Sequence, residues 1–414
     1  MRIPVRWWVA VLLFIASTIN YLDRQAFSIA TPEIAAEFGL SNVDISWIIF
    51  AFTLSYTVGQ LLMGKLMDVT GARVGFVVIM AIWSAAGMAT AAARSVLGFS
   101  IFRFVLGIGE SGNWPASVKT IAEWFPPRQR SLGIAFFTSG TTLGNVIAPL
   151  LIGQLIIAYG WRTAFIVIGA AGFLWIPVWL VFYRSPGENA RVSAEELAEL
   201  DKPKKSQSKS LVEWASLLRY RQIWGVTLVR FFTDSVLYFY IAWLPKYLAD
   251  ERAFTMEDIR DYLPLVFVPT VVFLYIGGAV AGKLIANGWS IDRARKTAML
   301  FPGITMCCSV AMGYVESNGV ALLIAAAALC SFYAISVQAL TLPTDLVPPR
   351  LVGSVSGLSG FGAGFGFLIF NYAVGQVADL YGFRPVFVMV GLLPIGALLM
   401  LYGVMGKIER VIEE

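Results

Sequence analysis

The sequence predicts an all-α membrane protein whose twelve transmembrane helices form two pseudo-symmetric halves of six helices each. Apolar and aromatic residues make up 58% of the 414 residues and charged residues only 14%, whereas soluble domains carry about 25% charged residues. The apolar runs are continuous over about 20 residues, the length of a membrane-spanning helix. A transmembrane barrel would show short alternating segments instead. Part of the second half also repeats the first at a constant offset.

Apolar runs separated by glycines, prolines and charge clusters are the expected spans. In the first half they are residues 8–30, 43–67, 75–93, 96–117, 131–156 and 162–182. In the second half they are residues 223–245, 263–285, 297–315, 319–342, 353–377 and 383–405. The first run follows Arg2 and Arg6, as in a signal peptide, but it leads directly into the next run. We therefore expect a retained helix.

The long polar stretch between the sixth and seventh spans is expected to be a cytoplasmic linker, residues 183–222. It separates an N-terminal six-helix half, residues 1–182, from a C-terminal six-helix half, residues 223–414. Within it, Ser193 and Glu196 have the spacing of a capping box. This pattern predicts a short surface helix before the lysine-rich part of the linker.

The basic residues set the expected orientation. With a cytoplasmic N-terminus, 22 of the 31 lysines and arginines lie in inside segments, six lie outside and three lie within spans. This asymmetry predicts that both termini are cytoplasmic, and it accounts for the net charge of +5 without nucleic acid. None of the eight asparagines lies in an Asn-x-Ser/Thr sequon, which favours a prokaryotic origin. The expected location is a bacterial inner (plasma) membrane. The chain has no histidine, so any proton coupling must fall on carboxylates.

The two halves are related at a constant offset of 222 residues. Three segments recur: Pro126-Pro127-Arg128 as Pro348-Pro349-Arg350, Gly153-Gln154 as Gly375-Gln376, and Tyr159-Gly160-Trp161-Arg162 as Tyr381-Gly382-Phe383-Arg384. Such a repeat indicates duplication of a half. Two halves related by an axis along the membrane normal place a substrate site between them, and rocking of the halves gives alternating access. This is the arrangement of the major facilitator superfamily, which the sequence resembles.

The loop after the second span, residues 64–73, is similar to that superfamily's signature loop. The resemblance implies that Asp68 and Arg73 brace a cytoplasmic gate. The second half repeats Gly282-Lys283-Leu284 but has Ala286 at the position of Asp68. Ordinary solvation of a loop is the alternative interpretation.

Six ionisable side chains fall within spans, where each is costly unless it is paired or hydrated: Asp23, Arg24, Arg103, Glu110, Arg230 and Asp234. Such residues are functional candidates by default. The four in the first half have a formal sum of zero, so protonation of one carboxylate makes the group positive and favours an anionic substrate. The alternative is that they only pin the first and fourth spans together.

In the first half, Arg24 offers a planar, permanent charge that suits a carboxylate. Arg103 and Glu110 are seven residues apart and share a helix face. Burial raises a carboxyl pKa and a nearby arginine lowers it, so such a carboxylate can be switched. We assign proton coupling first to Glu110 and second to Asp23, with Arg103 as the partner that competes with the proton.

In the second half, Arg230 and Asp234 have the spacing of a helical ion pair, which needs no ligand. Tyr238, Tyr240 and Trp243 follow and can stack on a sugar ring. An interfacial aromatic belt is the alternative for Trp243. Other polar residues deep in spans complete a candidate pocket for a polyhydroxylated ligand: Tyr56, Thr138, Ser139, Thr141, Gln338 and Asn371.

Four motifs resemble a narrower group, the anion:cation symporter family: Asn20-Tyr21-Leu22-Asp23-Arg24-Gln25, Gly109-Glu110-Ser111-Gly112-Asn113-Trp114-Pro115, Ala122-Glu123-Trp124-Phe125-Pro126 and Tyr183-Arg184-Ser185-Pro186. That family includes bacterial hexuronate, galactonate and glucarate transporters. The stretch from Arg230 to Asp234 and the stretch from Trp243 to Tyr247 look most like the hexuronate branch.

The resemblance implies a role for each matching residue. Arg24 would bind the substrate carboxylate, Tyr21 and Tyr56 would line the pocket, and Asp23, Arg103 and Glu110 would couple the proton. Family members often carry Asn at the position of Thr138 and again near Gln338, where sugar hydroxyls would be read.

The expected function is a proton-coupled symporter that imports a sugar-acid anion, a hexuronate such as galacturonate or glucuronate. The alternatives are another organic anion, such as galactonate or glucarate, and an exporter of different specificity. An enzyme is not expected, because the sequence shows no nucleophile–base pair, metal-ligand set or nucleotide loop. No cofactor beyond the coupling proton and no metal are expected, and the expected partners are the small anion and the lipid bilayer, with the protein a monomer.

Overall fold

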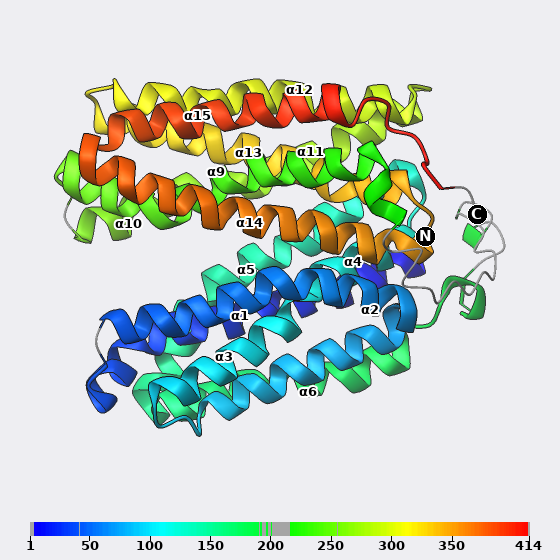
Figure 1. The fold of residues 1–414 in the computed structure, drawn as a ribbon. Coiled ribbons are helices and arrows are strands. Elements are labelled where there is room, and N and C mark those ends of the chain that lie inside the picture. Colours follow the sequence, from blue (N-terminus) through cyan, green and yellow to red (C-terminus); the bar gives the residue numbers. More distant parts are fainter. Residues whose placement is uncertain are drawn as a thin grey trace. The chain divides into compact units, whose positions relative to one another are not determined.

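The computed structural model describes residues 4–40, 42–189, 191–192, 196–197, 200, 216–254 and 256–412. Every regular element in these ranges is a helix. Figure 1 shows long helices that run roughly alongside one another within each part of the chain. Most of the predicted linker, including Ser193 of its capping box and residues 202–209, lies outside the described residues.

The first half contains six α-helices. They are α1 (Val5–Phe38), α2 (Asn42–Thr90), α3 (Val96–Ser111), α4 (Asn113–Trp124), α5 (Pro127–Tyr159) and α6 (Trp161–Phe182). In α2 the backbone leaves helical geometry at Gly71, where φ is 74°. This glycine divides α2 into the second and third predicted spans.

The second half begins after two short 3-10 turns, η1 (Pro186–Glu188) and η2 (Leu217–Arg219). The long helices are α9 (Arg221–Arg252), α10 (Met256–Phe267), α11 (Thr270–Ala286), α12 (Ile291–Met306), α13 (Asn318–Leu346), α14 (Pro349–Tyr381) and α15 (Phe383–Leu399). Two irregular segments extend α12 and α15: the 3-10 segment η3 (Cys307–Gly313) and the π-helical segment η4 (Met400–Val404).

In the described part of the chain, nine helices are long and apolar enough to cross a membrane. One of them, residues 47–90, has 44 residues, about twice the length that a bilayer requires. The fourth predicted span is divided between α3 and α4, and the ninth between α12 and η3. The predicted fold class, an all-helical bundle of membrane-spanning helices, is confirmed, and the merged and divided helices are compatible with the twelve predicted spans.

The sequence repeat corresponds to a repeated turn. Gly160 joins α5 to α6 and Gly382 joins α14 to α15, with φ of 78° and 73°. A side chain is strained at such a φ, so glycine is favoured at both positions. The recurring Tyr-Gly motif is therefore a helix connection that was duplicated with the half.

The chain divides into two compact units. Unit 1 consists of Met1–Pro126, Phe136–Lys209 and Pro349–Leu358, and unit 2 of Pro127–Ala135, Ser210–Pro348 and Ser359–Glu414. The first turns of α5 thus belong to unit 2, and the first turns of α14 belong to unit 1. A short segment of each half is part of the other half's unit.

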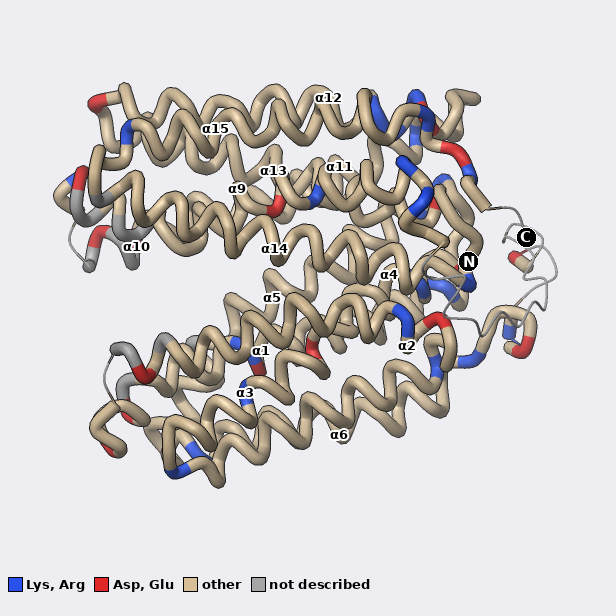
Figure 2. The backbone as a smooth tube through the Cα atoms, viewed as in Figure 1, with Lys and Arg blue, Asp and Glu red and all other residues tan. Residues whose placement is uncertain are grey.

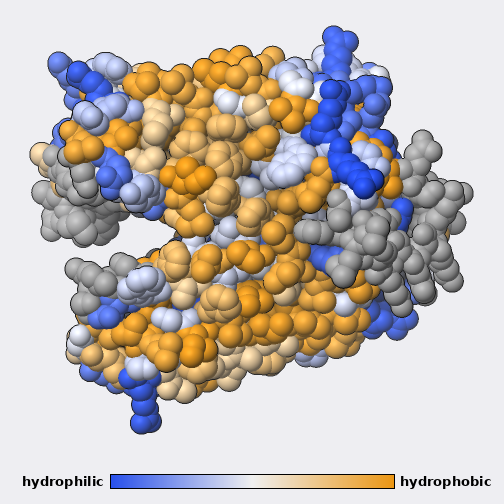
Figure 3. All heavy atoms as spheres, in the orientation of Figure 1, coloured by the Kyte–Doolittle hydropathy of each residue, from blue (hydrophilic) through white to orange (hydrophobic). Residues whose placement is uncertain are grey.

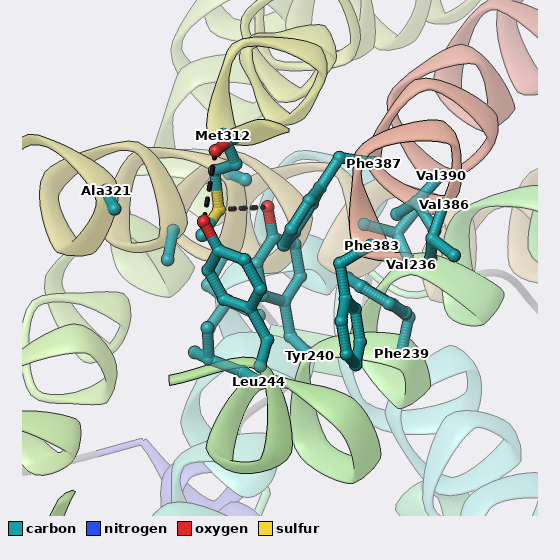
Figure 4. Close-up of a cluster of buried hydrophobic side chains, with 14 of the residues drawn as sticks. Val236, Phe239, Tyr240, Leu244, Met312, Ala321, Phe383, Val386, Phe387 and Val390 are labelled. Carbon is teal, nitrogen blue, oxygen red and sulfur yellow. Dashed lines mark hydrogen bonds between the residues drawn. The ribbon is translucent and has the colours of Figure 1, made fainter. Parts of the chain in front are cut away.

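Each unit has its own hydrophobic core. In unit 1 the side chains of α1, α5 and α6 pack around Phe27, Phe99 and Trp161. In unit 2 those of α9, α13 and α15 pack around Tyr240, Phe383 and Phe387, as Figure 4 shows for part of the cluster. Figure 3 shows apolar side chains along the middle of the helices and hydrophilic ones near their ends. This distribution suits helices that cross a bilayer.

Candidate functional site

The charged centre of unit 1 is an ion pair between Arg24 on α1 and Glu110 on α3. Arg24 donates from Nη2 at 2.9 Å and from Nε at 3.1 Å, and both bonds reach Oε2 of Glu110. The Glu110 side chain is fully buried, whereas that of Arg24 is 23% exposed. Figure 2 shows charged positions midway along the helices as well as at the helix ends. A charge at this depth is stable only when it is paired or hydrated.

Aromatic rings surround the Arg24 guanidinium. Its central carbon lies 4.9 Å from the ring centre of Tyr21, 4.6 Å from that of Tyr56 and 5.5 Å from that of Phe52. Rings at this distance attract a cation through their π faces. The structure thus brings together three of the predicted binding residues, Arg24, Tyr21 and Tyr56, and adds Phe52 to them.

Arg103 and Asp23 complete the group of charges. The Arg103 guanidinium lies 4.8 Å from the ring of Phe27 and 4.6 Å from that of Phe52. Its Nε and Nη1 have no hydrogen-bond partner among the described residues, and neither has Oδ2 of Asp23. The sequence suggested Arg103 as the partner of Glu110, but the structure places Arg24 there. Arg103 is still close enough to act electrostatically on Glu110 and Asp23.

The predicted polar residues of α5 lie beside α1. At Gly144 an added Cβ would lie 2.8 Å from Cβ of Tyr21, so the two helices are in close contact. Thr141 and Ser139 donate to the backbone carbonyls of Thr138 and Phe136, three residues earlier in each case. The hydroxyl oxygen of Thr141 can also accept a hydrogen bond.

A pair of amides beside Arg24 was not among the predicted residues. Gln25 on α1 donates from Nε2 to Oδ1 of Asn145 on α5 at 2.8 Å, and the contact is solvent-exposed. Asn145 lies one turn beyond Thr141 on the same face. That spacing, together with an asparagine in the middle of a span, is the sequence signal that would have found it.

In unit 2 the predicted pair is formed. Arg230 donates to Oδ2 of Asp234 from Nη2 at 2.8 Å and from Nε at 3.2 Å, and Thr233 donates to Oδ1 at 3.1 Å. Arg230 also donates from Nη1 to Ser359 at 3.2 Å. Both charges are about nine-tenths buried. This network pairs both charges within unit 2, and a role of Asp234 in binding substrate stays a prediction.

The remaining predicted residues of unit 2 lie in different surroundings. Trp243 on α9 donates to Oδ1 of Asn371 on α14 at 2.8 Å, in an exposed position. The ring of Tyr238 packs on that of Phe367, with 4.6 Å between the ring centres. Tyr240, by contrast, is fully buried in the core beside Ser309. Figure 4 shows its ring among apolar side chains, so it offers no stacking surface to a sugar.

Gln338 is fully buried and its amide is already engaged. It donates from Nε2 to the carbonyl of Gly277 and accepts at Oε1 from Nη1 of Arg295 at 2.9 Å. Arg295 in turn donates to Asp345 at 2.8 Å. The structure therefore does not place Gln338 with Trp243 and Asn371, and its role in binding substrate stays a prediction.

Comparison with known proteins identifies the family. The family model of the Major Facilitator Superfamily matches residues 13–286. The chain belongs to the major facilitator superfamily. It is therefore a multi-pass membrane transport protein and not an enzyme.

Two curated relatives of this superfamily chain match along nearly their whole length. One is a hexuronate transporter of Escherichia coli strain K12, 27% identical over 409 residues, which cover 97% of this chain and 94% of the relative. Another is a D-galactonate transporter of Escherichia coli O6:H1, 28% identical over 422 residues, with 98% and 97% covered. Among solved structures, the proton:xylose symporter XylE has a TM-score of 0.73 at 15% identity, with 98% of each chain covered. This last similarity shows the fold alone.

The superfamily's signature loop has a defined geometry here. Asp68 accepts from the backbone N–H of Gly353 at 3.0 Å and of Ser354 at 2.6 Å, at the start of α14 and within unit 1. The Nζ of Lys119 lies 3.0 Å from Oδ1 of Asp68 and donates to the carbonyl of Pro349 at 2.7 Å. A carboxylate is stabilised at a helix N-terminus.

Arg73 is placed differently from Asp68. It donates from Nη2 to the carbonyl of Leu180, at the end of α6, at 2.8 Å. Lys119 was not predicted as a gate residue, although it is the buried cation that completes the contact between Asp68 and α14. In the sequence, Lys119 has only the i,i+4 spacing to Glu123 of an ordinary helical ion pair, which does not point to a gate.

Proposed function

We propose that this superfamily member is a proton-coupled symporter that imports a sugar-acid anion, a hexuronate such as galacturonate or glucuronate, by alternating access. The observation that carries the proposal is the contact between Arg24, which is partly exposed, and Glu110, which is fully buried. The names of the curated relatives support the substrate class.

Arg24 is the proposed anchor for the substrate carboxylate. Two of its nitrogens, Nε and Nη2, donate to one oxygen of Glu110, and a guanidinium can equally engage both oxygens of a carboxylate. A sugar-acid carboxylate offers the same ligand atoms and approaches from the exposed side of the group. The rings of Tyr21 and Tyr56 hold the guanidinium in place when its hydrogen bonds to Glu110 break.

Proton coupling follows from this competition. Asp23, Arg24, Arg103 and Glu110 have a formal sum of zero. A proton on Glu110 removes its negative charge, weakens its hold on Arg24 and leaves the group at +1. Binding of the anion then restores a net charge of zero. Only the fully loaded carrier and the empty carrier can therefore change conformation without an excess charge in the low-dielectric membrane. Asp23 and Arg103 adjust how readily Glu110 takes the proton.

Paired amides and aromatic side chains are proposed to read the sugar hydroxyls. In unit 1 they are Gln25 and Asn145, with Thr138, Ser139 and Thr141 alongside. In unit 2 they are Trp243 and Asn371, with Tyr238 and Asp234 on the same helix as Trp243. Asn145 and Asn371 each keep an amide nitrogen as a donor while their oxygens accept from protein.

Further parts of the proposal concern the setting of the protein. Asp68 and Arg73 would brace the cytoplasmic gate, both termini would be cytoplasmic, and the carrier would work as a monomer in the bacterial inner membrane. The contact of Asp68 with the start of α14 supports the gate.

The test uses purified protein in proteoliposomes. Galacturonate, glucuronate, galactonate and glucarate are compared for thermal stabilisation of the protein, for uptake, and for acidification of the lumen during uptake. We expect a hexuronate to give the strongest response and to carry protons with it. Strongest uptake of galactonate or glucarate would reassign the substrate, and uptake without acidification would refute proton coupling.

A further inference from the structure

A buried polar seam lies between α1 and the junction of α3 with α4. We define it by Ser17 and Asn20 on α1 and by Asn113 and Ser117 on α4. All four side chains are fully buried. Nδ2 of Asn113 donates to Oγ of Ser17 at 3.3 Å, across the two helices. This bond joins residues that are 96 positions apart in the sequence.

The position of Asn20 follows from two contacts that bracket it. Arg24, four residues further along α1, binds Glu110, and Ser17, three residues earlier, binds Asn113. Residues at these spacings lie on one helix face. Asn20 therefore lies on the face of α1 that is directed at the stretch between Glu110 and Asn113.

The seam contains buried polar atoms that no described residue satisfies. They are Nδ2 and Oδ1 of Asn20, Oδ1 of Asn113 and Oγ of Ser117. Oε1 of Glu110, the oxygen that Arg24 does not contact, has no such partner either. Buried polar groups without partners cost free energy, and internal water is the usual partner when donors and acceptors lie together.

We propose that the seam binds ordered water and that this water carries the coupling proton between Glu110 and the part of α4 that bears Ser117. The proposal rests on proton coupling at Glu110. The O–H bond of the protonated Glu110 breaks and its proton joins a seam water. That water releases one of its own protons to the next, so charge moves along the seam and no electrons are transferred.

The charges around the seam favour this direction. Once the substrate has left, Arg24 returns to Oε2 of Glu110, and its two hydrogen bonds stabilise the carboxylate that the released proton leaves behind. The substrate side of Glu110 is occupied by Arg24, because both hydrogen bonds of Arg24 reach Oε2. The proton therefore has a separate route from the sugar.

The test replaces the seam amides with leucine, which has a similar volume and holds no water. In Asn20→Leu and Asn113→Leu we expect counterflow, which exchanges sugar without net proton movement, to stay within about twofold of wild type. Proton-driven accumulation should slow by about tenfold or more, since positioned proton transfer contributes at least this much, and the solvent deuterium isotope effect should rise. Thr90→Val is the matched control, because Thr90 is buried and its hydroxyl binds its own helix at Ala86.

Asn20→Ser supplies a second arm, because a smaller polar side chain leaves room for water. Asn20→Ser should keep proton-driven accumulation near the wild-type rate. This arm tests the proposal even if the leucine variants do not fold. Normal proton-driven accumulation in the leucine variants, or an equal loss in Asn20→Ser and Asn20→Leu, would overturn the relay. Absence of proton uptake in the wild-type protein is a separate result, which would refute coupling itself.

Discussion

The Glu110→Gln variant tests the central competition. In the wild-type protein Oε2 of Glu110 accepts two hydrogen bonds from Arg24, at 2.9 and 3.1 Å. A neutral amide keeps the shape but removes the charge, and a hydrogen bond to a charged partner exceeds a neutral one by about 1 kcal/mol or more. For two bonds the interaction free energy between residue 110 and Arg24 falls by about 2 kcal/mol, so Arg24 is more readily available to the substrate carboxylate.

A change of this size corresponds to about a 30-fold higher affinity for the anion at a pH where wild-type Glu110 is ionised. The variant mimics the protonated carrier, so substrate binding should also lose its dependence on pH. Binding is measured by isothermal titration across a pH series, and transport by counterflow and by accumulation against a gradient. We expect counterflow to persist and accumulation to be lost.

The control for this experiment is Glu37→Gln, which changes a carboxylate on α1 beyond the span, paired with Arg162. It should bind and accumulate substrate like the wild-type protein. If Glu110→Gln bound the anion with unchanged affinity and pH dependence, or still accumulated it with protons, the competition between proton, Arg24 and substrate would be wrong.

Three other predictions follow from the same contacts. Arg24→Lys keeps the charge but loses the planar fork, so the KM for the sugar acid should rise by about tenfold or more, whereas an unchanged KM would remove Arg24 from the carboxylate site. Asp68→Asn removes the negative charge that lies 3.0 Å from the buried Nζ of Lys119 and weakens the contact with the start of α14. Transport should fall by about tenfold while substrate-induced thermal stabilisation persists, and full transport would refute the gate. Hydrogen bonds from Arg162 and Trp161 lower the pKa of Glu37 from 4.5, so this contact stabilises the folded protein above that pH and is lost as the pH falls through the lowered pKa. Thermal unfolding from pH 7 to pH 3 should therefore bring wild type and Glu37→Gln closer together at the acid end, and a constant difference would contradict this.

Much of the fold could be predicted because a bilayer imposes strict demands on a chain. Each span must satisfy its own backbone hydrogen bonds, so length and hydropathy alone reveal helices. The duplicated Tyr-Gly turns at Gly160 and Gly382 were also readable, because their positive φ favours glycine. The division of the ninth span into α12 and η3 could not be predicted. The span contains proline and glycine, but so do other spans, and these residues do not show where the geometry changes.

The candidate site was predictable in membership and less so in pairing. The charges of Arg24, Arg103 and Glu110 stand out in apolar spans because burial makes them costly. Their partners depend on how each helix is rotated about its axis and shifted along it, and hydropathy encodes neither. The spacing of Arg103 and Glu110 on one helix favoured that pair, but the side chain of Arg24 reaches Glu110 across 86 residues.

By itself the sequence therefore determined that the chain spans a membrane, that it is duplicated, and which charges the membrane would not tolerate without a partner or water. Only the tertiary structure decided that Glu110 binds Arg24, that Gln25 meets Asn145, and that Asn20 faces a seam of unsatisfied polar atoms. The physical reason is that burial cost is a property of each residue in its helix, whereas a hydrogen bond between helices depends on the packing that brings two of them within about 3 Å.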